Sequence, residues 1–459
     1  MQNGGGCMGK NIRVSFVTLG CKLNYAETST IERSFVRYGC SVSDWREGAD
    51  IFVVNTCAVT ETSERKCRSF IRRLHRVSPS AWIAVTGCYA QLKGDSLYSL
   101  EGVKFVFGSK DKGKIADTVM SAFESSLSGN GSADILAAGG LSRGECLLAG
   151  GMSGLAVTDD SFFLAYSSGE ERTRSFLKVQ DGCDFHCTYC TVWIARGESR
   201  NASVAKVVEE ARSIASAGVR EIVLTGVNTG DFGKTTGESF LDLLKALNEV
   251  EGIERYRISS IEPNLLTHEI IDWIASVDKF MPHFHIPLQS GSDRILKAMG
   301  RRYRAADFLE KLDYVRRAFY RHYDALGEDG KDRVFFGIDV IAGFPGETEG
   351  EFMETYGLLE RARPAFLHVF PYSKRPGTVA ASLPGQIPEE VKNSRVERLM
   401  ALSGRLYSDF VKANSGRREL VLFESKEKGG MMSGYTRNYI KVERPFSEDS
   451  IGRIAEVVI

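Results

Sequence analysis

The sequence lacks three features that would direct it to a membrane, to export or to a strongly charged partner. No apolar run approaches the roughly 18 residues that cross a bilayer, and the first residues, MQNGGGCMGK, lack the apolar segment of a signal peptide. The 59 basic and 59 acidic residues cancel to a formal charge of zero. A nucleic acid must therefore be bound by a local patch and not by a global field. We expect a soluble, cytoplasmic protein.

The chain is too long for one compact core. Its 459 residues exceed the roughly 250–300 residues at which single hydrophobic cores stop growing. A stretch rich in Gly, Ser and Ala separates two regions in which apolar runs alternate with amphipathic stretches. We expect an N-terminal α/β domain at 1–123, a linker at 124–171, a larger α/β domain at 172–414 and a small all-β module at 415–459.

The alternation of short apolar runs and helical patterns predicts parallel sheets. In the N-terminal domain the expected strands are 12–18, 51–54, 81–86 and 104–107, with helices that include 27–38 and 63–75. In the second domain they are 176–180, 221–225, 255–259, 283–288, 334–341 and 365–370, with helices that include 204–217 and 347–361. Six such units favour an open barrel or a doubly wound sheet over a complete eight-stranded barrel. The final module has β-like runs at 419–423, 434–442 and 454–459.

Three cysteines stand close together in the sequence DGCDFHCTYC. Cys183, Cys187 and Cys190 are spaced C-x3-C-x2-C and follow the expected strand 176–180. Ligand sites of α/β sheets lie beyond the carboxyl ends of the strands. Three thiolates can hold three irons of a 4Fe–4S cluster and leave the fourth iron open to a small molecule. Zinc is the alternative, with His186 as a possible fourth ligand.

Three other cysteines are far apart in the sequence but occupy equivalent places in the pattern. Cys21, Cys57 and Cys88 each lie within a few residues of the end of an expected strand, about one β/α unit apart. Because the carboxyl ends of parallel strands meet at one edge of a sheet, these side chains can converge there on a second cluster. For each cysteine alone, an inert place in the core is the alternative.

The tight cysteine group carries a resemblance to a known superfamily. The C-x3-C-x2-C motif after the first strand of a six-fold β/α repeat resembles the radical S-adenosylmethionine (SAM) enzymes. The resemblance implies that Cys183, Cys187 and Cys190 bind a 4Fe–4S cluster whose open iron chelates SAM. One electron from such a cluster splits SAM into methionine and a 5′-deoxyadenosyl radical.

The sequence motifs around the scattered cysteines point to one family within this superfamily. TLGCKLNYAET, VVNTCAVTETSERK and VTGCYAQ resemble the N-terminal domain of the methylthiotransferases, and GFPGE, VFPYSKRPGT and a TRAM-like terminal module agree. That family carries two 4Fe–4S clusters and inserts sulfur, then methyl, at an unactivated C–H position. By resemblance, Cys21, Cys57 and Cys88 bind the auxiliary cluster. Trp193 stands where the family commonly has proline.

Segments at the other strand ends supply candidate contacts to SAM. LTGVNTGDFG brings glycines where a backbone approaches a ligand, and polar residues follow the next three strands. The candidates are Tyr189, Thr225, Gly226, Asn228, Ser260, Glu262, Gln289 and Asp339. Each segment alone is equally typical of a βα turn. Asn24 and Asn55, on two of the cysteine loops, could hydrogen-bond sulfurs or loop backbone, or cap the turns.

The residue after the first cysteine distinguishes three branches of the family. Lys22 in LGCKLN resembles the branch that methylthiolates threonylcarbamoyladenosine beside the tRNA anticodon. Branches that act on isopentenyladenosine in tRNA or on a ribosomal-protein aspartate usually have Gln or Pro there. The resemblance implies three partners: the tRNA anticodon arm, an electron donor such as flavodoxin or ferredoxin, and a sulfur donor.

Two segments are candidates for RNA contact. The basic stretch 64–76 includes Arg65, Lys66, Arg72 and Arg73, which could meet phosphates or simply form a solvated helix face. In GYTRNYIKV, Tyr435 and Tyr439 could stack on bases beside Arg437, or fill the core of a small barrel.

Two other classes of protein explain part of the sequence. A radical SAM enzyme with a different chemistry explains Cys183, Cys187 and Cys190 but leaves the scattered cysteines without a role. A zinc-stabilised RNA-binding protein explains the tight triplet and the terminal module. Metal content separates the three hypotheses, because two clusters, one cluster and zinc give different amounts of iron.

Overall fold

The computed structural model describes residues 11–58, 60–127, 162–167 and 173–459. It consists of two compact units. The N-terminal unit contains the described residues up to Ser167 together with Ile194–Gly197, and the barrel unit contains those of Ser168–Trp193 and Glu198–Ile459. Most of the expected linker, residues 128–161 and 168–172, lies outside the described residues.

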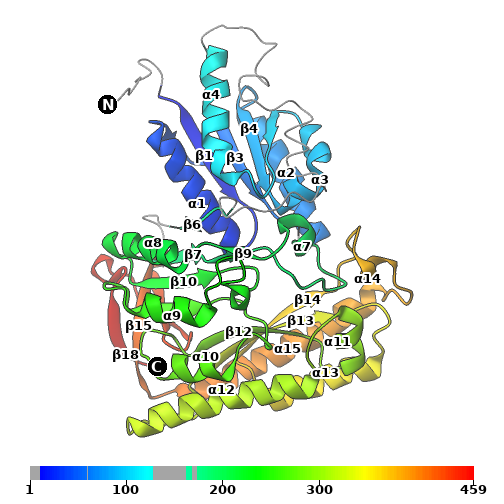
Figure 1. Ribbon diagram of the computed structural model, residues 1–459, viewed down its shortest axis with the longest axis vertical. Coiled ribbons are helices and arrows are strands. Elements are labelled where there is room, and N and C mark those ends of the chain that lie inside the picture. The colour runs from blue at the N-terminus through cyan, green and yellow to red at the C-terminus, as the bar shows by residue number, and fades with distance from the viewer. Residues whose placement is uncertain (1–10, 59, 128–161, 168–172) are drawn as a thin grey trace. The chain divides into compact units, whose positions relative to one another are not determined.

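The N-terminal unit is a parallel sheet covered by helices on both faces (Figure 1). The strand order is β2-β1-β3-β4-β5, with β1 (Arg13–Thr18), β2 (Ser41–Val42), β3 (Ile51–Thr56), β4 (Trp82–Gly87) and β5 (Val103–Val106). The helices are α1 (Lys22–Arg37), α2 (Glu61–Val77), α3 (Cys88–Tyr98) and α4 (Ile115–Leu127). One core joins one face of the sheet to α1 and α4 through residues such as Phe35 and Val119, and a second joins the other face to α2 and α3 through Ile71 and Leu97.

The four strands expected in this unit are present, and helix α1 shows where the sequence pattern misleads. It begins at Lys22, five residues before the start expected at residue 27. Its N-cap is Cys21, whose side chain makes no capping hydrogen bond, so the usual Ser, Thr, Asp or Asn signal for a helix start is absent. By contrast, α2 begins after Thr60, whose hydroxyl accepts the Ser63 N–H at 3.1 Å. The two-residue strand β2 was not expected.

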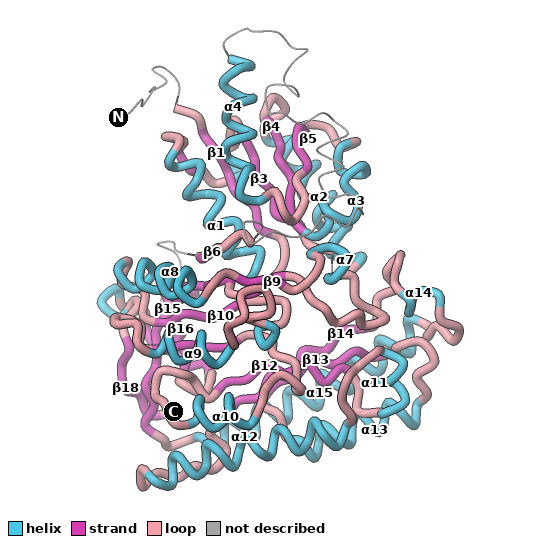
Figure 2. The backbone as a smooth tube through the Cα atoms, viewed as in Figure 1, coloured by secondary structure: helices cyan, strands magenta, loops and turns pink. Residues whose placement is uncertain are grey.

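The barrel unit contains six parallel strands that form an open partial barrel (Figure 2). They are β7 (Arg174–Lys178), β10 (Glu221–Thr225), β11 (Arg255–Ile258), β12 (His283–Gln289), β13 (Phe335–Ala342) and β14 (Phe366–Pro371). β7, β10 and β11 pair in one group and β12, β13 and β14 in another. Parallel bridges from Tyr256 to Phe280 and from Ser260 to His285 connect the groups. The expected six-unit α/β architecture is therefore confirmed.

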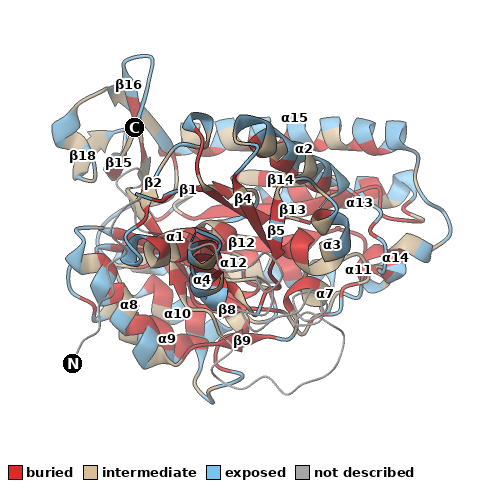
Figure 3. Cartoon of the chain, turned by 90° about the horizontal axis from the view of Figure 1, so that it is seen from above, coloured by how far each residue is buried: buried red, intermediate tan, exposed pale blue. Residues whose placement is uncertain are grey.

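Helices surround these strands, and most of the strand residues are buried (Figure 3). The carboxyl end of β14 is exposed. The longer helices are α8 (Val204–Ser216), α9 (Phe240–Asn248), α10 (His268–Ala275), α11 (Asp293–Met299), α12 (Ala305–Ala325), α13 (Glu349–Ala362) and α15 (Glu389–Asn414). Shorter elements of this unit are β8 (Gln180–Asp181), β9 (Arg200–Asn201) and α14 (Val379–Ser382). β6 (Ala165–Tyr166) belongs to the N-terminal unit, and α7 (Val192–Arg196) has residues in both units. Within the described part of the chain, no helix has the length and apolar character needed to cross a membrane.

The C-terminal module is an antiparallel sheet in the order β17-β16-β15-β18. Its strands are β15 (Arg418–Lys428), β16 (Met431–Thr436), β17 (Lys441–Pro445) and β18 (Ile454–Val458). The expectation of one strand at 434–442 was wrong. The chain turns between β16 and β17, where the Ile440 N–H donates to the Thr436 hydroxyl at 2.8 Å and Tyr439 adopts a left-handed φ of 66°.

The module is fixed to the barrel by buried arginines. Arg255 and Arg257 project from β11 and donate to the main-chain carbonyls of Leu420 and Thr436, at 2.7 and 2.8 Å. Behind them lies buried Glu221, 2.9 Å from the Arg257 Nε. Burial opposes ionisation of this carboxyl, but Arg257 and Arg174 hold its pKa below the usual value. The main-chain carbonyls of the module therefore accept hydrogen bonds from two buried arginines at this end of the barrel.

Candidate iron–sulfur and S-adenosylmethionine sites

Cys21, Cys57 and Cys88 follow three neighbouring parallel strands, β1, β3 and β4. Two glycines let their loops approach closely. A Cβ on Gly20, whose φ is +142°, would lie 3.1 Å from the Cys57 Cβ, and one on Gly87, whose φ is +99°, would lie 2.3 Å from the Thr56 carbonyl oxygen. The structure thus brings the three cysteine loops together at one edge of the sheet.

The two asparagines singled out in the sequence join these loops. The Asn24 amide donates to the carbonyls of Leu19 and Thr56, at 3.2 and 3.1 Å, and its oxygen lies 3.7 Å from the Cys21 Sγ. The Asn55 amide donates to the Asn24 carbonyl at 3.1 Å. Both side chains are fully buried, so they fix the backbone from which the sulfurs project.

The chemistry of this edge suits a metal cluster with sulfur ligands. All three cysteines are free thiols. Cys21 is the N-cap of α1 and Cys88 is the first residue of α3, and the positive ends of helix dipoles favour thiolates. Three sulfurs leave one iron of a 4Fe–4S cluster without a protein ligand.

The other described cysteines differ clearly from these. Cys40 and Cys67 are buried among apolar side chains, and burial raises the pKa of Cys40 to about 11. The Cys67 thiol donates to the Cys57 carbonyl at 3.6 Å. Cys40 and Cys67 are therefore core residues, whereas Cys7 and Cys146 lie outside the described residues.

In the barrel unit, Cys183, Cys187 and Cys190 lie on one loop that follows β8. Backbone N–H groups of Phe185 and Val192 point at the sulfurs of Cys183 and Cys190, each at 3.4 Å. Burial raises the pKa of Cys183 to about 12 and that of Cys190 to about 11, and the neighbouring sulfurs add to both effects. Binding of a metal by these thiols releases protons, and hydrogen bonds to the sulfurs tune a bound cluster.

The zinc alternative receives no support from His186. Its ring is exposed and packs edge-on against Trp193, with centroids 4.7 Å apart. Trp193 therefore shields one side of the loop at the position where the resemblance led us to expect proline.

One arginine that was not anticipated connects several of the candidate SAM contacts. Arg301 lies 3.4 Å from both the Cys187 Sγ and the Tyr189 hydroxyl and forms a short ion pair with Glu262. Burial raises the pKa of Glu262, an effect that Arg301 opposes. The guanidinium is only 2% exposed, so it is a fixed positive charge beside the cysteine loop. Its signal in the sequence was a basic run, MGRRYR, directly after a helix.

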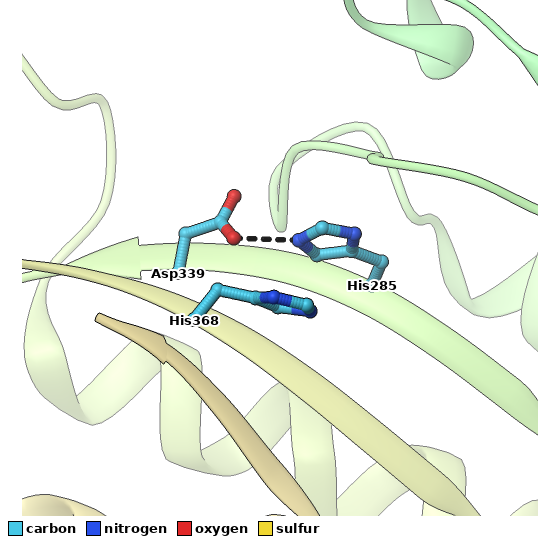
Figure 4. A group of neighbouring side chains, drawn as sticks. All are labelled: His285, Asp339 and His368. Carbon is cyan, nitrogen blue, oxygen red and sulfur yellow. Dashed lines mark hydrogen bonds and ion pairs between the residues drawn. The ribbon is translucent and has the colours of Figure 1, made fainter. Parts of the chain in front are cut away.

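A polar triad lines the inner side of β12, β13 and β14 (Figure 4). The His285 Nε2 is 2.6 Å from the Asp339 carboxylate, and the His368 ring stacks on that of His285 with centroids 4.7 Å apart. Burial opposes ionisation of Asp339, but His285, and beyond it His368 and Arg301, hold its pKa below the usual value. Asp339 was a candidate from the sequence. Both histidines were missed, although polar residues inside otherwise apolar strands were a signal.

The side chain of Gln180 explains why residue 226, in the loop after β10, is a glycine. Its amide donates to the Gly182 carbonyl at 2.8 Å and to the Ser199 hydroxyl at 2.9 Å, while its oxygen accepts the N–H groups of Val227 and Asn228, both at 2.9 Å. A Cβ on Gly226 would lie 2.9 Å from this oxygen. Gln180 thus ties the start of the cysteine loop to the neighbouring strand end.

The remaining candidate SAM contacts have varied surroundings. The Thr225 hydroxyl donates to the Leu177 carbonyl inside the sheet at 3.2 Å. The Asn228 oxygen accepts the Glu262 N–H at 3.3 Å, and the Ser260 carbonyl accepts the Thr229 hydroxyl at 3.0 Å. Gln289 ends β12 with a left-handed φ of 69°. These residues lie at strand ends as expected, but Thr225 already has a structural partner.

A buried charge network lies beneath the cysteine loops of the N-terminal unit. Arg196, which belongs to this unit, donates to Glu27 at 3.0 Å and to the Asn24 oxygen at 2.8 Å. Lys112 pairs with the same Glu27. The three charged side chains are at most 2% exposed. Arg196 follows Cys190 by six residues in the sequence and belongs, as part of Ile194–Gly197, to the compact unit that carries the first three cysteines.

The candidate RNA contacts lie in two different settings. On α2, Arg65, Lys66, Arg72 and Arg73 are all exposed, and this part of the surface is open to a partner. Tyr435 and Tyr439 instead stack on each other, with centroids 4.7 Å apart. Further contacts to these rings come from Arg174, His283 and Phe335, and Arg437 donates to the Asp278 carbonyl. The tyrosine rings therefore pack against residues of the barrel strands, which differs from the expected alternative that they fill the core of a small barrel.

Comparisons with known proteins agree with this geometry. Residues 177–359 match the Radical SAM superfamily and residues 13–108 match the Uncharacterized protein family UPF0004. The chain is 38% identical over 454 residues to the threonylcarbamoyladenosine tRNA methylthiotransferase MtaB of Bacillus subtilis, covering 97% of this chain and 93% of that protein. The protein of the same name from Thermotoga maritima is 34% identical, with 95% and 91% covered.

Two further comparisons are with a relative that has a different name and with a solved structure. The tRNA-2-methylthio-N(6)-dimethylallyladenosine synthase of Desulfosudis oleivorans is 31% identical, with 92% of this chain and 85% of that protein covered. The radical SAM methyltransferase TsrM from Kitasatospora setae shares the fold at a TM-score of 0.55 and 13% identity, with 81% and 77% covered. The chain belongs to the radical SAM methylthiotransferases, transferases whose chemistry depends on a 4Fe–4S cluster and SAM.

Proposed function

We propose that this protein replaces the hydrogen at C2 of N6-threonylcarbamoyladenosine, at position 37 of tRNA, with a methylthio group, using two 4Fe–4S clusters. The observation that carries the proposal is a triplet of free cysteines at strand carboxyl ends in each of the two units. A radical SAM enzyme without sulfur chemistry needs only Cys183, Cys187 and Cys190. The second triplet supplies the site from which sulfur is inserted.

The choice of substrate has two supports. Relatives from Bacillus subtilis, Aquifex aeolicus and Thermotoga maritima, at 38%, 32% and 34% identity, are named for threonylcarbamoyladenosine. Lys22, at the start of α1 beside Cys21, is the residue typical of that branch. Isopentenyladenosine in tRNA is the second candidate, because a relative at 31% identity is named for the dimethylallyl nucleoside. A ribosomal-protein aspartate, the other alternative substrate, has no support among these relatives.

The residues of the barrel unit have distinct parts in this chemistry. When bound, the reduced cluster of this unit supplies the electron that cleaves SAM to the 5′-deoxyadenosyl radical. Cys183, Cys187 and Cys190 hold it, and Arg301 places a buried positive charge beside the Cys187 sulfur. Glu262 and the Asp339–His285 pair offer anionic and hydrogen-bonding groups at the ends and inner side of the strands for the polar parts of SAM.

The other partners follow from the reaction. The tRNA anticodon arm is the substrate, and the exposed basic side chains of α2 offer phosphate contacts. An electron donor such as flavodoxin or ferredoxin reduces the clusters, and a sulfur donor resupplies the auxiliary one. We expect the protein to act in the cytoplasm, where its substrate is found.

Metal analysis tests the number of clusters. Protein prepared without oxygen is expected to be brown and to contain about eight irons per chain, four for each triplet. A variant with Cys183, Cys187 and Cys190 all changed to alanine is expected to keep about half of this iron. Zinc in place of iron, or a wild-type content of about four irons, contradicts the two-cluster hypothesis.

The product is tested by mass spectrometry of tRNA nucleosides. In cells that lack this gene, the methylthio form of threonylcarbamoyladenosine is expected to disappear while threonylcarbamoyladenosine itself accumulates. A plasmid copy should restore the product, and a copy with Cys187→Ala should not. Loss of methylthio-isopentenyladenosine instead assigns the second candidate, and unchanged nucleosides refute both.

A further inference from the structure

A strongly basic cavity lies between α11 and the start of α12, in the barrel unit. Its volume is about 550 Å³. Five cationic side chains line it: Arg294, Lys297, Arg301, Arg302 and Arg304. Only two acidic residues, Asp293 and Asp307, share the lining. In a chain with no net charge, such a local excess of positive charge needs an explanation.

The two acidic side chains are already used by the helix. The Asp293 carboxylate accepts the Ala305 N–H at 2.8 Å, and the Asp307 carboxylate accepts the Arg304 N–H at 2.9 Å. Both contacts cap the first turn of α12, where anions are stabilised by the free N–H groups and the helix dipole. They therefore serve the start of the helix and are not placed to neutralise the cations opposite them.

Three of the five cations are available to a ligand. Arg294 pairs with Glu351 and Arg301 with Glu262. Lys297, Arg302 and Arg304 are exposed, and within the described part of the chain none of the three forms an ion pair. We call these three residues the basic rim.

The basic rim is attached directly to the radical SAM cysteine loop. The Thr188 N–H donates to the Met299 carbonyl at 3.0 Å, and the Thr188 hydroxyl donates to the Ala298 carbonyl at 2.9 Å. Arg302 donates to the Asp184 carbonyl at 3.3 Å, and its guanidinium lies over the Phe185 ring, 4.2 Å from its centroid. The position of the rim is thus fixed relative to Cys183, Cys187 and Cys190.

We propose that Lys297, Arg302 and Arg304 bind backbone phosphates of the RNA substrate close to the nucleotide that is modified. This inference rests on the proposed function, because a nucleotide that reacts beside SAM brings its neighbouring phosphates to the rim of the same loop. Exposed Lys and Arg side chains attract phosphates, and neutralising the phosphates releases the counterions of the nucleic acid. Contacts of this kind fix the register of the RNA and carry no sequence information.

The test compares two pairs of charge changes in the holoenzyme. Lys297→Gln with Arg304→Gln removes two exposed positive charges of the rim that form no ion pair within the described part of the chain. Lys206→Gln with Arg212→Gln removes two exposed positive charges from α8, in the same unit. Binding of tRNA is measured as a function of salt concentration, together with the KM for tRNA and the iron content of each protein.

The rim variant is expected to lower the slope of log affinity against log salt by about 1.4 to 1.8, since each lost phosphate contact removes about 0.7 to 0.9. Its KM for tRNA should rise, with wild-type iron content. The α8 variant should keep the wild-type slope and KM. Equal slopes for the rim variant and the wild type, or an equal loss in both variants, overturn the proposal. If the wild-type protein forms no methylthio product, the proposed function fails instead, and this is recognised before the variants are compared.

Discussion

Replacing Cys187 with alanine is expected to abolish the reductive cleavage of SAM. Cys187 is the middle cysteine of its triplet and the one whose sulfur lies 3.4 Å from Arg301. With two sulfurs left, the cluster that delivers the electron is no longer held by three thiolates. The measurement is 5′-deoxyadenosine formed from SAM with a chemical reductant and without tRNA, and the expected value is the background of the assay.

Replacing Cys57 with alanine should separate the two reactions. The Cys183 loop is intact in this variant, so 5′-deoxyadenosine is still formed, but methylthiolation of tRNA should fall to background. Cys67→Ala is the matched control, because its thiol is buried and donates to the Cys57 carbonyl at 3.6 Å yet belongs to neither triplet. It should keep both reactions. Wild-type methylthiolation by the Cys57 variant would refute a role for the N-terminal triplet.

The sequence was sufficient to predict the sheet edges at which these cysteines lie. Parallel strands in this fold are short apolar runs separated by amphipathic helices. This alternation places Cys21, Cys57 and Cys88 each just after the end of an expected strand. The structure confirms that β1, β3 and β4 are neighbours. The convergence of distant residues was therefore predictable because it depends on strand order alone.

Side-chain partners across several elements were not predictable in this way. Arg301 connects the cysteine loop to Glu262, and His285 meets Asp339 from the adjacent strand. Such pairs depend on register and on side-chain direction, and a one-residue shift would reverse which face of a strand each residue occupies. Tyr439 illustrates the same limit, since its motif fits both base stacking and the packing against Phe335 that the structure shows.

Replacing Arg196 with glutamine is expected to destabilise the N-terminal unit strongly. The change removes a cationic partner of the fully buried Glu27 and the donor that holds the Asn24 oxygen at 2.8 Å. Removing a donor from buried acceptors typically costs about 1–3 kcal/mol for each acceptor left without its partner. Arg46→Gln is the control, because it breaks a surface pair with side chains 68% and 46% exposed, and such pairs are worth less than about 1 kcal/mol. The measurement is the free energy of unfolding in denaturant.

The same substitution should weaken iron binding by the N-terminal triplet, because Asn24 connects the loops of Cys21 and Cys57 through the carbonyls of Leu19 and Thr56. Iron is best measured with Cys183, Cys187 and Cys190 changed to alanine, where only this triplet can hold a cluster. Arg196→Gln should then lose iron during desalting, whereas Arg196→Lys, which keeps the charge but not the two-armed guanidinium, should lose less. If Arg196→Gln retains iron and stability like Arg46→Gln, the network has no part in forming the auxiliary site. If iron is lost, Arg196 helps to form the auxiliary site through its contact with Asn24.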